Sequence, residues 1–127
     1  MANQPQIFNY DPDSETARRK QGGAHAGRIG FPLCKTDLVT ADVRVIVQGG
    51  ENELHYHTGN DGFWMIREGR ARFYGESGAV IAELGKNEGI LIPRGFSYWF
   101  QIVGDEPLEV LHVAAKAQDT KDTYVER

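Results

Sequence analysis

The chain has 127 residues, of which 40% are hydrophobic and 25% are charged, and its formal net charge is −4. This is the size and composition of one soluble globular domain. The longest basic cluster is residues 18–20, so the sequence has no footprint for a nucleic acid. No apolar run approaches the roughly 18 residues of a membrane span, and the first residues lack a signal-peptide pattern, so we expect a cytoplasmic protein with no membrane partner. The single cysteine, Cys34, excludes an internal disulfide and a cysteine-built metal cluster.

Residues 1–27 are mostly polar and are predicted to form an arm without a core of its own. The isolated apolar side chains of Ile7, Phe8 and Tyr10 have no local partners there. Such a segment can add an edge strand to another surface, so we expect the arm to contribute to a homodimer. His25 lies among glycine and alanine and is expected to face solvent.

From residue 28 onward, short runs rich in β-branched and aromatic residues recur, and each run ends at a turn signal. The runs lie about 8–12 residues apart with no helical period between them, which predicts an all-β sandwich or barrel over residues 28–115. Residues 116–127 are polar and are predicted to form a loose tail or a short terminal turn. The predicted strands are 43–47, 53–57, 63–67, 71–74, 79–84, 90–92, 97–103 and 108–114.

The pair His55 and His57 is the first candidate for chemistry. In a strand, residues i and i+2 point to the same face, so both imidazoles are expected on one side, about 6–7 Å apart. Two neutral imidazoles on one face can converge on a single divalent ion. Glycines at positions 49, 62 and 69 turn the chain on both sides of the pair.

The stretch 49–69 resembles the first motif of the cupin superfamily, G-x5-H-x-H-x3-4-E-x6-G. The stretch 87–98 resembles the second cupin motif, G-x5-P-x-G-x2-H-x3-N, and the hairpin expected between the motifs falls at 70–86. The resemblance covers about residues 37–115. It implies one cupin barrel, which is a jelly roll or double-stranded β-helix.

Cupins typically bind a divalent metal through both histidines and the glutamate of the first motif and the histidine of the second. The resemblance therefore implies Fe, Zn, Ni or Mn bound by His55 and His57. Here Gly62 stands at the glutamate position and Tyr98 at the position of the second-motif histidine. Tyr98 is either a replacement metal ligand or a pocket wall. Asp61 adjoins the lost glutamate, and strand alternation turns it to the opposite face unless the loop 58–62 bulges and makes it a ligand.

The predicted pocket is lined by Trp64, Tyr98 and His112. His112 lies on the apolar face of the last predicted strand, so it is either a satisfied core histidine or a pocket residue. A small, mostly apolar cavity with a few polar groups suits a small organic ligand. Arg28 and Arg94 can meet a carboxylate, but solvated faces are their expected place.

Three functions follow from these features. The leading one is a metal-dependent cupin enzyme of dioxygenase, isomerase or lyase type that acts on a small organic molecule. The second is a metal-free enzyme, epimerase-like or cyclase-like, in which Tyr98 and His112 act as acid and base. The third is a cupin that binds a small ligand and performs no chemistry, because a fold alone does not specify a reaction.

Overall fold

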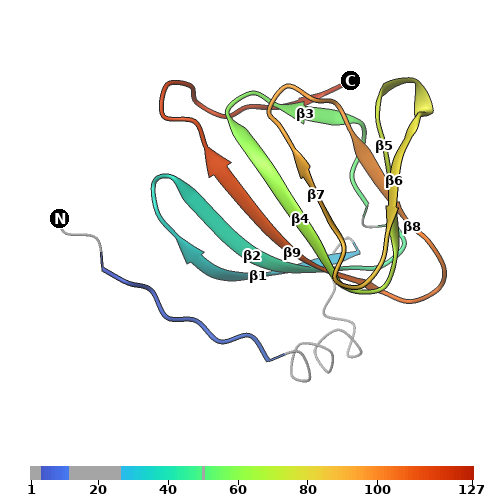
Figure 1. The fold of residues 1–127 in the computed structure, drawn as a ribbon, viewed down its shortest axis with the longest axis horizontal. Helices are drawn as coiled ribbons and strands as arrows, with labels where there is room; N and C mark the ends of the chain where they lie inside the picture. The colour runs from blue at the N-terminus through green and yellow to red at the C-terminus, as the bar shows by residue number, and fades with distance from the viewer. Residues whose placement is uncertain (1–3, 12–26, 50) are drawn as a thin grey trace.

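The computed structural model describes residues 4–11, 27–49 and 51–127. Ten strands and one short 3₁₀ turn make up the regular structure of this part of the chain (Figure 1). In chain order the elements are β1 (Arg28–Lys35), β2 (Val39–Ile46), β3 (His55–His57), β4 (Asn60–Glu68), β5 (Ala71–Tyr74), η1 (Glu76–Gly78), β6 (Val80–Leu84), β7 (Gly89–Ile92), β8 (Trp99–Ile102), β9 (Leu108–Lys116) and β10 (Tyr124–Glu126).

The strands form two layers that face each other (Figure 1). One layer is a five-stranded sheet in the order β1-β2-β9-β4-β7. The other contains the three-stranded sheet β6-β5-β8 and the two-stranded sheet β10-β3. His55 and Tyr98 connect these smaller sheets by exchanging backbone hydrogen bonds of 3.1 and 2.9 Å. The predicted all-β jelly roll is therefore confirmed.

Alternation along β4 shows why the sequence folds into two layers. Trp64 and Ile66 point into the space between the sheets and are 2% and 0% exposed, whereas Phe63 points outward and is 41% exposed. The same period of two holds in β5, β7 and β8, so one face of each of these strands contributes to a shared core. That core consists of Ile46, Trp64, Ile66, Ala71, Phe73, Ile92, Tyr98, Phe100, Ile102, Leu108 and Val110.

The eight predicted strands correspond to β2 through β9, and two further strands were not predicted. β1 contains Pro32, and its pairing with β2 shifts register between Pro32 and Cys34. A proline without an N–H donor is tolerated in a sheet at an edge strand or a bulge, and β1 is an edge strand. Because β1 is an edge strand, it tolerates Pro32, which interrupts its apolar pattern.

β10 is the second unpredicted strand, and it corrects the expectation of a loose tail at 116–127. Tyr124, Val125 and Glu126 pair with β3 in antiparallel register. The polar composition of this segment gave no strand signal because the strand is short and largely exposed. Its pairing brings Tyr124 and Glu126 next to the histidines of β3.

The described part of the arm, residues 4–11, contacts the same domain. Gln6 makes two hydrogen bonds to the backbone of Lys35, of 2.7 and 2.8 Å. The Tyr10 hydroxyl donates to Glu109 Oε1 at 3.0 Å, on the outer face of the five-stranded sheet. The arm is thus held at both ends of this segment.

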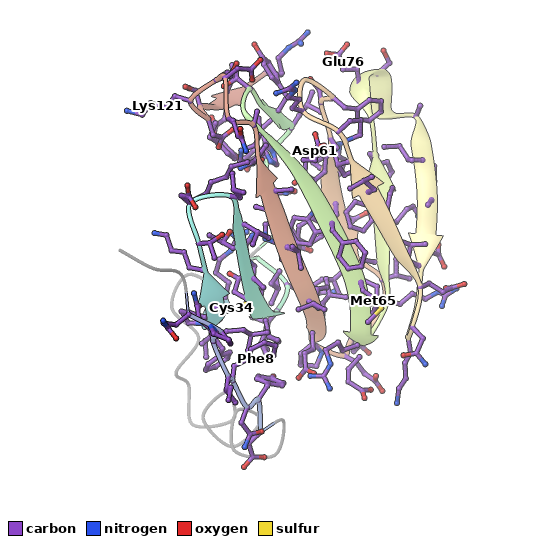
Figure 2. The ribbon with its side chains drawn as sticks, turned by 60° about the vertical axis from the view of Figure 1, so that its left-hand side comes forward. Phe8, Cys34, Asp61, Met65, Glu76 and Lys121 are labelled. Atoms are coloured by element: carbon purple, nitrogen blue, oxygen red, sulfur yellow. The ribbon has the colours of Figure 1, made fainter. Side chains whose placement is uncertain are left out.

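Two apolar side chains of the arm remain outside those contacts. Ile7 is 98% exposed and Phe8 is 52% exposed. Phe8 is labelled in Figure 2. The expected role of the arm in a homodimer stays a prediction. His25 lies outside the described residues. Within the described residues, no helix is long and apolar enough to span a membrane.

Candidate functional site

A cavity of about 550 Å³ lies between the two layers. Its walls come from β1, β2, β3, β4, β7, β9 and β10, together with the loops that precede β3 and β8. The structure brings every residue of the predicted site to this one cavity, namely His55, His57, Trp64, Tyr98 and His112.

His55 is the most enclosed of the three histidines. Its ring stacks on Tyr124 at 4.3 Å between centroids and lies 4.6 Å from the ring of Tyr98. Its Nδ1 lies 2.6 Å from the carbonyl oxygen of Glu53, which fixes the N–H on Nδ1 and leaves Nε2 with its lone pair. Burial lowers the pKa of His55, so the ring is neutral at pH 7.

His57 is held in the same way by a residue from far along the chain. Its Nδ1 lies 2.9 Å from Asp122 Oδ2, and the two imidazoles of β3 are 5.3 Å apart between centroids. Asp122 also accepts a hydrogen bond from the backbone N–H of Gly59 at 3.0 Å. The carboxylate thereby orients the ring and leaves Nε2 of His57 available.

His112 approaches the cavity from β9, in the opposite layer. Its Nδ1 lies 3.4 Å from Asp42 Oδ1, and its ring centroid is 4.4 Å from that of Trp64. Burial lowers the pKa of His112, against the opposing effect of Asp42. The neutral ring therefore directs its N–H toward the carboxylate and keeps a lone pair on Nε2.

Tyr98 and Trp64 form the deep wall of the cavity and are 3% and 2% exposed. Burial raises the pKa of Tyr98 to about 12, against a lowering effect of the neighbouring Trp64 indole. The indole Nε1 does not reach hydrogen-bond geometry with the Tyr98 hydroxyl or with any other group in the described residues. The phenol is thus a proton donor at neutral pH, and the buried indole N–H has no acceptor.

Gly62 leaves part of the cavity open. A Cβ built on Gly62 would lie 3.4 Å from Trp64 Nε1 and 3.7 Å from His112 Nε2, which are ordinary contacts. We call this part of the cavity, bounded by Gly62, Trp64 Nε1 and His112 Nε2, the Gly62 space. Asp61 lies outside the cavity, as alternation predicted, and accepts a hydrogen bond from the backbone N–H of Arg94 at 2.9 Å (Figure 2).

Arg28 and Arg44 line the cavity, and the position of Arg28 differs from the one expected from the sequence. Arg28 was expected on a solvated face, but it lines the cavity because β1 continues the five-stranded sheet past β2. Burial, followed by the positive charge of Arg44, lowers the pKa of Arg28. Arg94 is half-exposed and lies 3.7 Å from Asp119, outside the cavity, in agreement with the expected solvated place.

Sequence reasoning missed four residues of the site: Asp42, Arg44, Asp122 and Tyr124. Asp42 comes directly before the predicted strand 43–47 and Arg44 lies within it, and the two stand at alternate positions among apolar residues. That alternation was a usable signal for a polar inner face. Asp122 and Tyr124 had no such signal, because only the pairing of β10 with β3 brings them to the histidines.

The donor set provides half of a four-ligand cupin metal site. His55 and His57 present Nε2 lone pairs, but the glutamate position is Gly62 and the fourth position is a phenol whose pKa is about 12. Within the described residues, no group of three or more histidine, cysteine, aspartate or glutamate side chains is arranged to hold a metal ion. These residues do not fit the four-ligand site that the cupin motifs imply.

A family model described as "Cupin domain" matches residues 43–114, more than half of the chain. The chain therefore belongs to the cupin family. No protein among the curated ones matches it.

Solved structures with the same fold include a Klebsiella pneumoniae protein with a double-stranded β-helix domain, which is 19% identical, with 82% of this chain and 89% of that chain covered and a TM-score of 0.68. KdgF from Halomonas sp. is 13% identical, with 91% and 98% covered and a TM-score of 0.67. A cupin from Methanocaldococcus jannaschii is 15% identical, with 91% and 94% covered and a TM-score of 0.65. At these identities the likeness concerns the fold.

Proposed function

We propose that this cupin is an enzyme that moves a proton at a carbon atom of a small organic molecule without a bound metal. The observation that supports this best is the setting of His112, whose Nδ1 faces Asp42 while Nε2 borders the Gly62 space. A neutral imidazole oriented by a carboxylate is the usual form of a general base.

Tyr98 supplies the complementary group. Its buried phenol keeps its proton at neutral pH because its pKa is about 12. It lines the same cavity as His112, with Trp64 in ring contact with both. One cavity thus contains a base without a proton and an acid with one, which is the division of labour that proton transfer requires.

In the proposed step, the C–H bond next to a carbonyl group breaks, and its proton moves to Nε2 of His112. The electron pair of that bond moves toward the carbonyl oxygen, which accepts a proton from the Tyr98 hydroxyl, and an enediol forms when the first carbon carries a hydroxyl group. His112 then gives its proton to the former carbonyl carbon, and the hydroxyl of the first carbon gives its proton to the Tyr98 oxygen and becomes the new carbonyl. The result is the isomerisation of an α-hydroxy carbonyl compound.

The test is exchange of carbon-bound hydrogen for deuterium in D₂O, followed by NMR over a panel of small keto acids, hydroxy acids and sugar acids. We expect exchange in at least one compound, at the same rate after treatment with a chelator. His112→Gln should slow it by about 10²–10⁴-fold, because a positioned base contributes that much. A panel without exchange contradicts the proposal and leaves the function of a ligand-binding cupin.

One observation favours the metal-dependent function as a second candidate. The Nδ1 atoms of His55 and His57 are both engaged, by a backbone carbonyl and by Asp122, which is how metal-binding histidines are usually oriented. A divalent ion on the two Nε2 atoms would act as a Lewis acid toward a carbonyl or carboxylate.

Calorimetric titration with Zn, Ni, Mn and Fe(II) tests this second candidate. Metal uptake by the wild type that is lost in His57→Ala, together with deuterium exchange that stops on chelation, would favour it over the metal-free enzyme. Tyr98→Phe should then weaken uptake if the phenol is a ligand. Equal affinity of the wild type and His57→Ala for every ion contradicts the two-histidine site.

A further inference from the structure

We propose that the Gly62 space binds a carboxylate group of the ligand, with Trp64 Nε1 and Arg44 as its main donors. This inference deepens the proposed function by naming the substrate class as small carboxylic acids, and it rests on the same cavity. Four observations carry it.

The first observation is the unpaired indole. Trp64 is 2% exposed, and its Nε1 has no hydrogen-bond acceptor in the part of the chain that the structure describes. A buried indole N–H usually has an acceptor, because the group otherwise loses its hydrogen bond with water and gains nothing in return. Nε1 borders the cavity at Gly62, so an acceptor atom of a bound ligand can take this bond.

The second observation is the shape of the Gly62 space. The cupin motif has a glutamate at this position, and the glycine here removes that side chain and its carboxylate. A built Cβ makes only ordinary contacts of 3.4 to 4.0 Å, so a side chain is accepted here, and Gly62 itself lines the cavity. A ligand carboxylate placed there takes the position that the motif assigns to a protein carboxylate.

The third observation is charge. The guanidinium of Arg44 lies 5.4 Å from the ring centroid of Trp64, and Arg44 lines the same cavity. Its Nε is bound to Asp42 at 3.1 Å, and its terminal nitrogens have no hydrogen bond to the described residues. A planar guanidinium with free terminal N–H groups is well suited to a carboxylate.

Acidic groups also lie near this charge. Asp42 is shared between Arg44 and His112, and Glu51 and Glu53 line the cavity. The carboxylate of Glu51 is turned to the backbone N–H groups of Gly49 and Ile102, at 2.8 and 3.2 Å. Arg28 adds a second guanidinium to the same cavity.

The fourth observation is the position of His112 Nε2, which lies 3.7 Å from the Cβ built on Gly62, whereas Trp64 Nε1 lies 3.4 Å from it. A carboxylate bound to Trp64 Nε1 would therefore have its adjacent carbon atoms close to the base. The Tyr98 hydroxyl, which keeps its proton, is available to the same ligand. Binding and proton transfer thus use different atoms of one cavity.

The chain has two tryptophans, which gives a direct test. Trp99 stacks on Tyr74 at 4.3 Å and does not line the cavity, so Trp99→Phe leaves Trp64 as the single fluorescent reporter. The probes are propionate, lactate and pyruvate, each compared with its neutral amide. We expect the carboxylates, but not the amides, to change the Trp64 emission in a saturable way.

Trp64→Phe tests the indole donor, and Gly62→Glu tests the Gly62 space. Calorimetry measures how tightly each variant binds the same probes. Trp64→Phe keeps an aromatic ring and removes the N–H, and it should weaken carboxylate binding about tenfold. Gly62→Glu puts a protein carboxylate into the Gly62 space and should abolish binding, while Gly62→Ala shows that the strand accepts a side chain. Trp99→Phe is the matched control and should bind as the wild type does.

Equal binding of carboxylates and amides, or wild-type affinity in both Trp64→Phe and Gly62→Glu, overturns this inference. His112→Gln separates it from the proposed function, because this variant should bind carboxylates and fail to exchange deuterium. Selective carboxylate binding without exchange in any compound leaves the carboxylate site intact and overturns only the proposed reaction. Exchange that is equally fast for acids and amides overturns only the carboxylate site.

Discussion

Asp122 holds His57 across 65 residues of sequence, with Oδ2 2.9 Å from the imidazole Nδ1. The other oxygen of the same carboxylate accepts the backbone N–H of Gly59 at 3.0 Å. One side chain therefore fixes the orientation of a cavity histidine and also attaches the segment before β10 to the turn after β3. The stability of this attachment can be measured separately from any activity.

Asp122→Asn should lower the free energy of unfolding by about 1 kcal/mol at pH 7, because it removes a charge-assisted hydrogen bond at a partly exposed site. Burial acts to raise the pKa of Asp122, but the hydrogen bonds from His57 and Gly59 outweigh it and the pKa is lowered. The charged carboxylate thus stabilises the fold above the ordinary pKa of 3.8, and this contribution disappears as the pH falls through the lowered value. Urea unfolding between pH 2 and 7 measures both effects. Asp119→Asn, at an exposed site, is the matched control and should change neither.

The buried imidazole of His112 should also make the free energy of unfolding depend on pH. Burial lowers its pKa in the folded state, so below about pH 6.5 the unfolded chain binds more protons than the folded one. Stability should therefore be complete above pH 6.5 and should fall as the pH decreases through the window below it. His112→Gln should flatten this slope, and His55 should account for part of what remains. Identical slopes in the wild type and His112→Gln would show that His112 is not held neutral by burial.

Phe73→Ala tests the core behind the cavity. The side chain is fully buried and lies 5.6 Å from Phe100 and 6.1 Å from Trp64, between ring centroids. Removing it should cost about 3–5 kcal/mol of unfolding free energy, because the cavity left behind cannot fully collapse. Phe63→Ala, at an exposed position of β4 in the opposite layer, should cost about 1 kcal/mol or less. Similar costs for the two variants would contradict the assignment of their strand faces.

The N-terminal arm has exposed apolar side chains that could contact a second copy of the chain. We propose a homodimer in which Ile7 and Phe8 contact a second copy, because both are exposed while Tyr10 is occupied on its own domain. The double variant Ile7→Ser with Phe8→Ser should shift the mass seen by light scattering toward the monomer. Leu91→Ser, on the exposed face of β7, is the control and should leave the mass unchanged. A shift caused by Leu91→Ser alone would place the interface on the sheet face instead of the arm.

The strands of the two layers were predictable because their inner and outer faces differ in hydrophobicity. The period of two identified β2 through β9, and the turn residues between them separated one strand from the next. β1 and β10 were not predictable in this way. Pro32 interrupts the pattern of β1, and the three residues of β10 are stabilised by pairing with β3 and not by an apolar face of their own.

The cavity was partly predictable for the same reason. Alternation along β4 and β9 placed Trp64 and His112 on inner faces, and the spacing of His55 and His57 placed both on one side of β3. The groups that orient these histidines come from other strands. No local pattern links Asp42 to His112 or Asp122 to His57, so these pairs required the three-dimensional structure.

The two sides of the cavity also differ in how firmly the backbone holds them. β9 is paired along its length with β2 on one side and β4 on the other, whereas β3 has three residues and pairs with the equally short β10. Opening a segment requires breaking its hydrogen bonds, so β3 and β10 separate at a lower free-energy cost than β9. We therefore expect His112 to stay in place on a timescale on which His55 and His57 can move away from the opposite wall. A ligand would then enter by the temporary retreat of one side of its site, while the base that would act on it does not move.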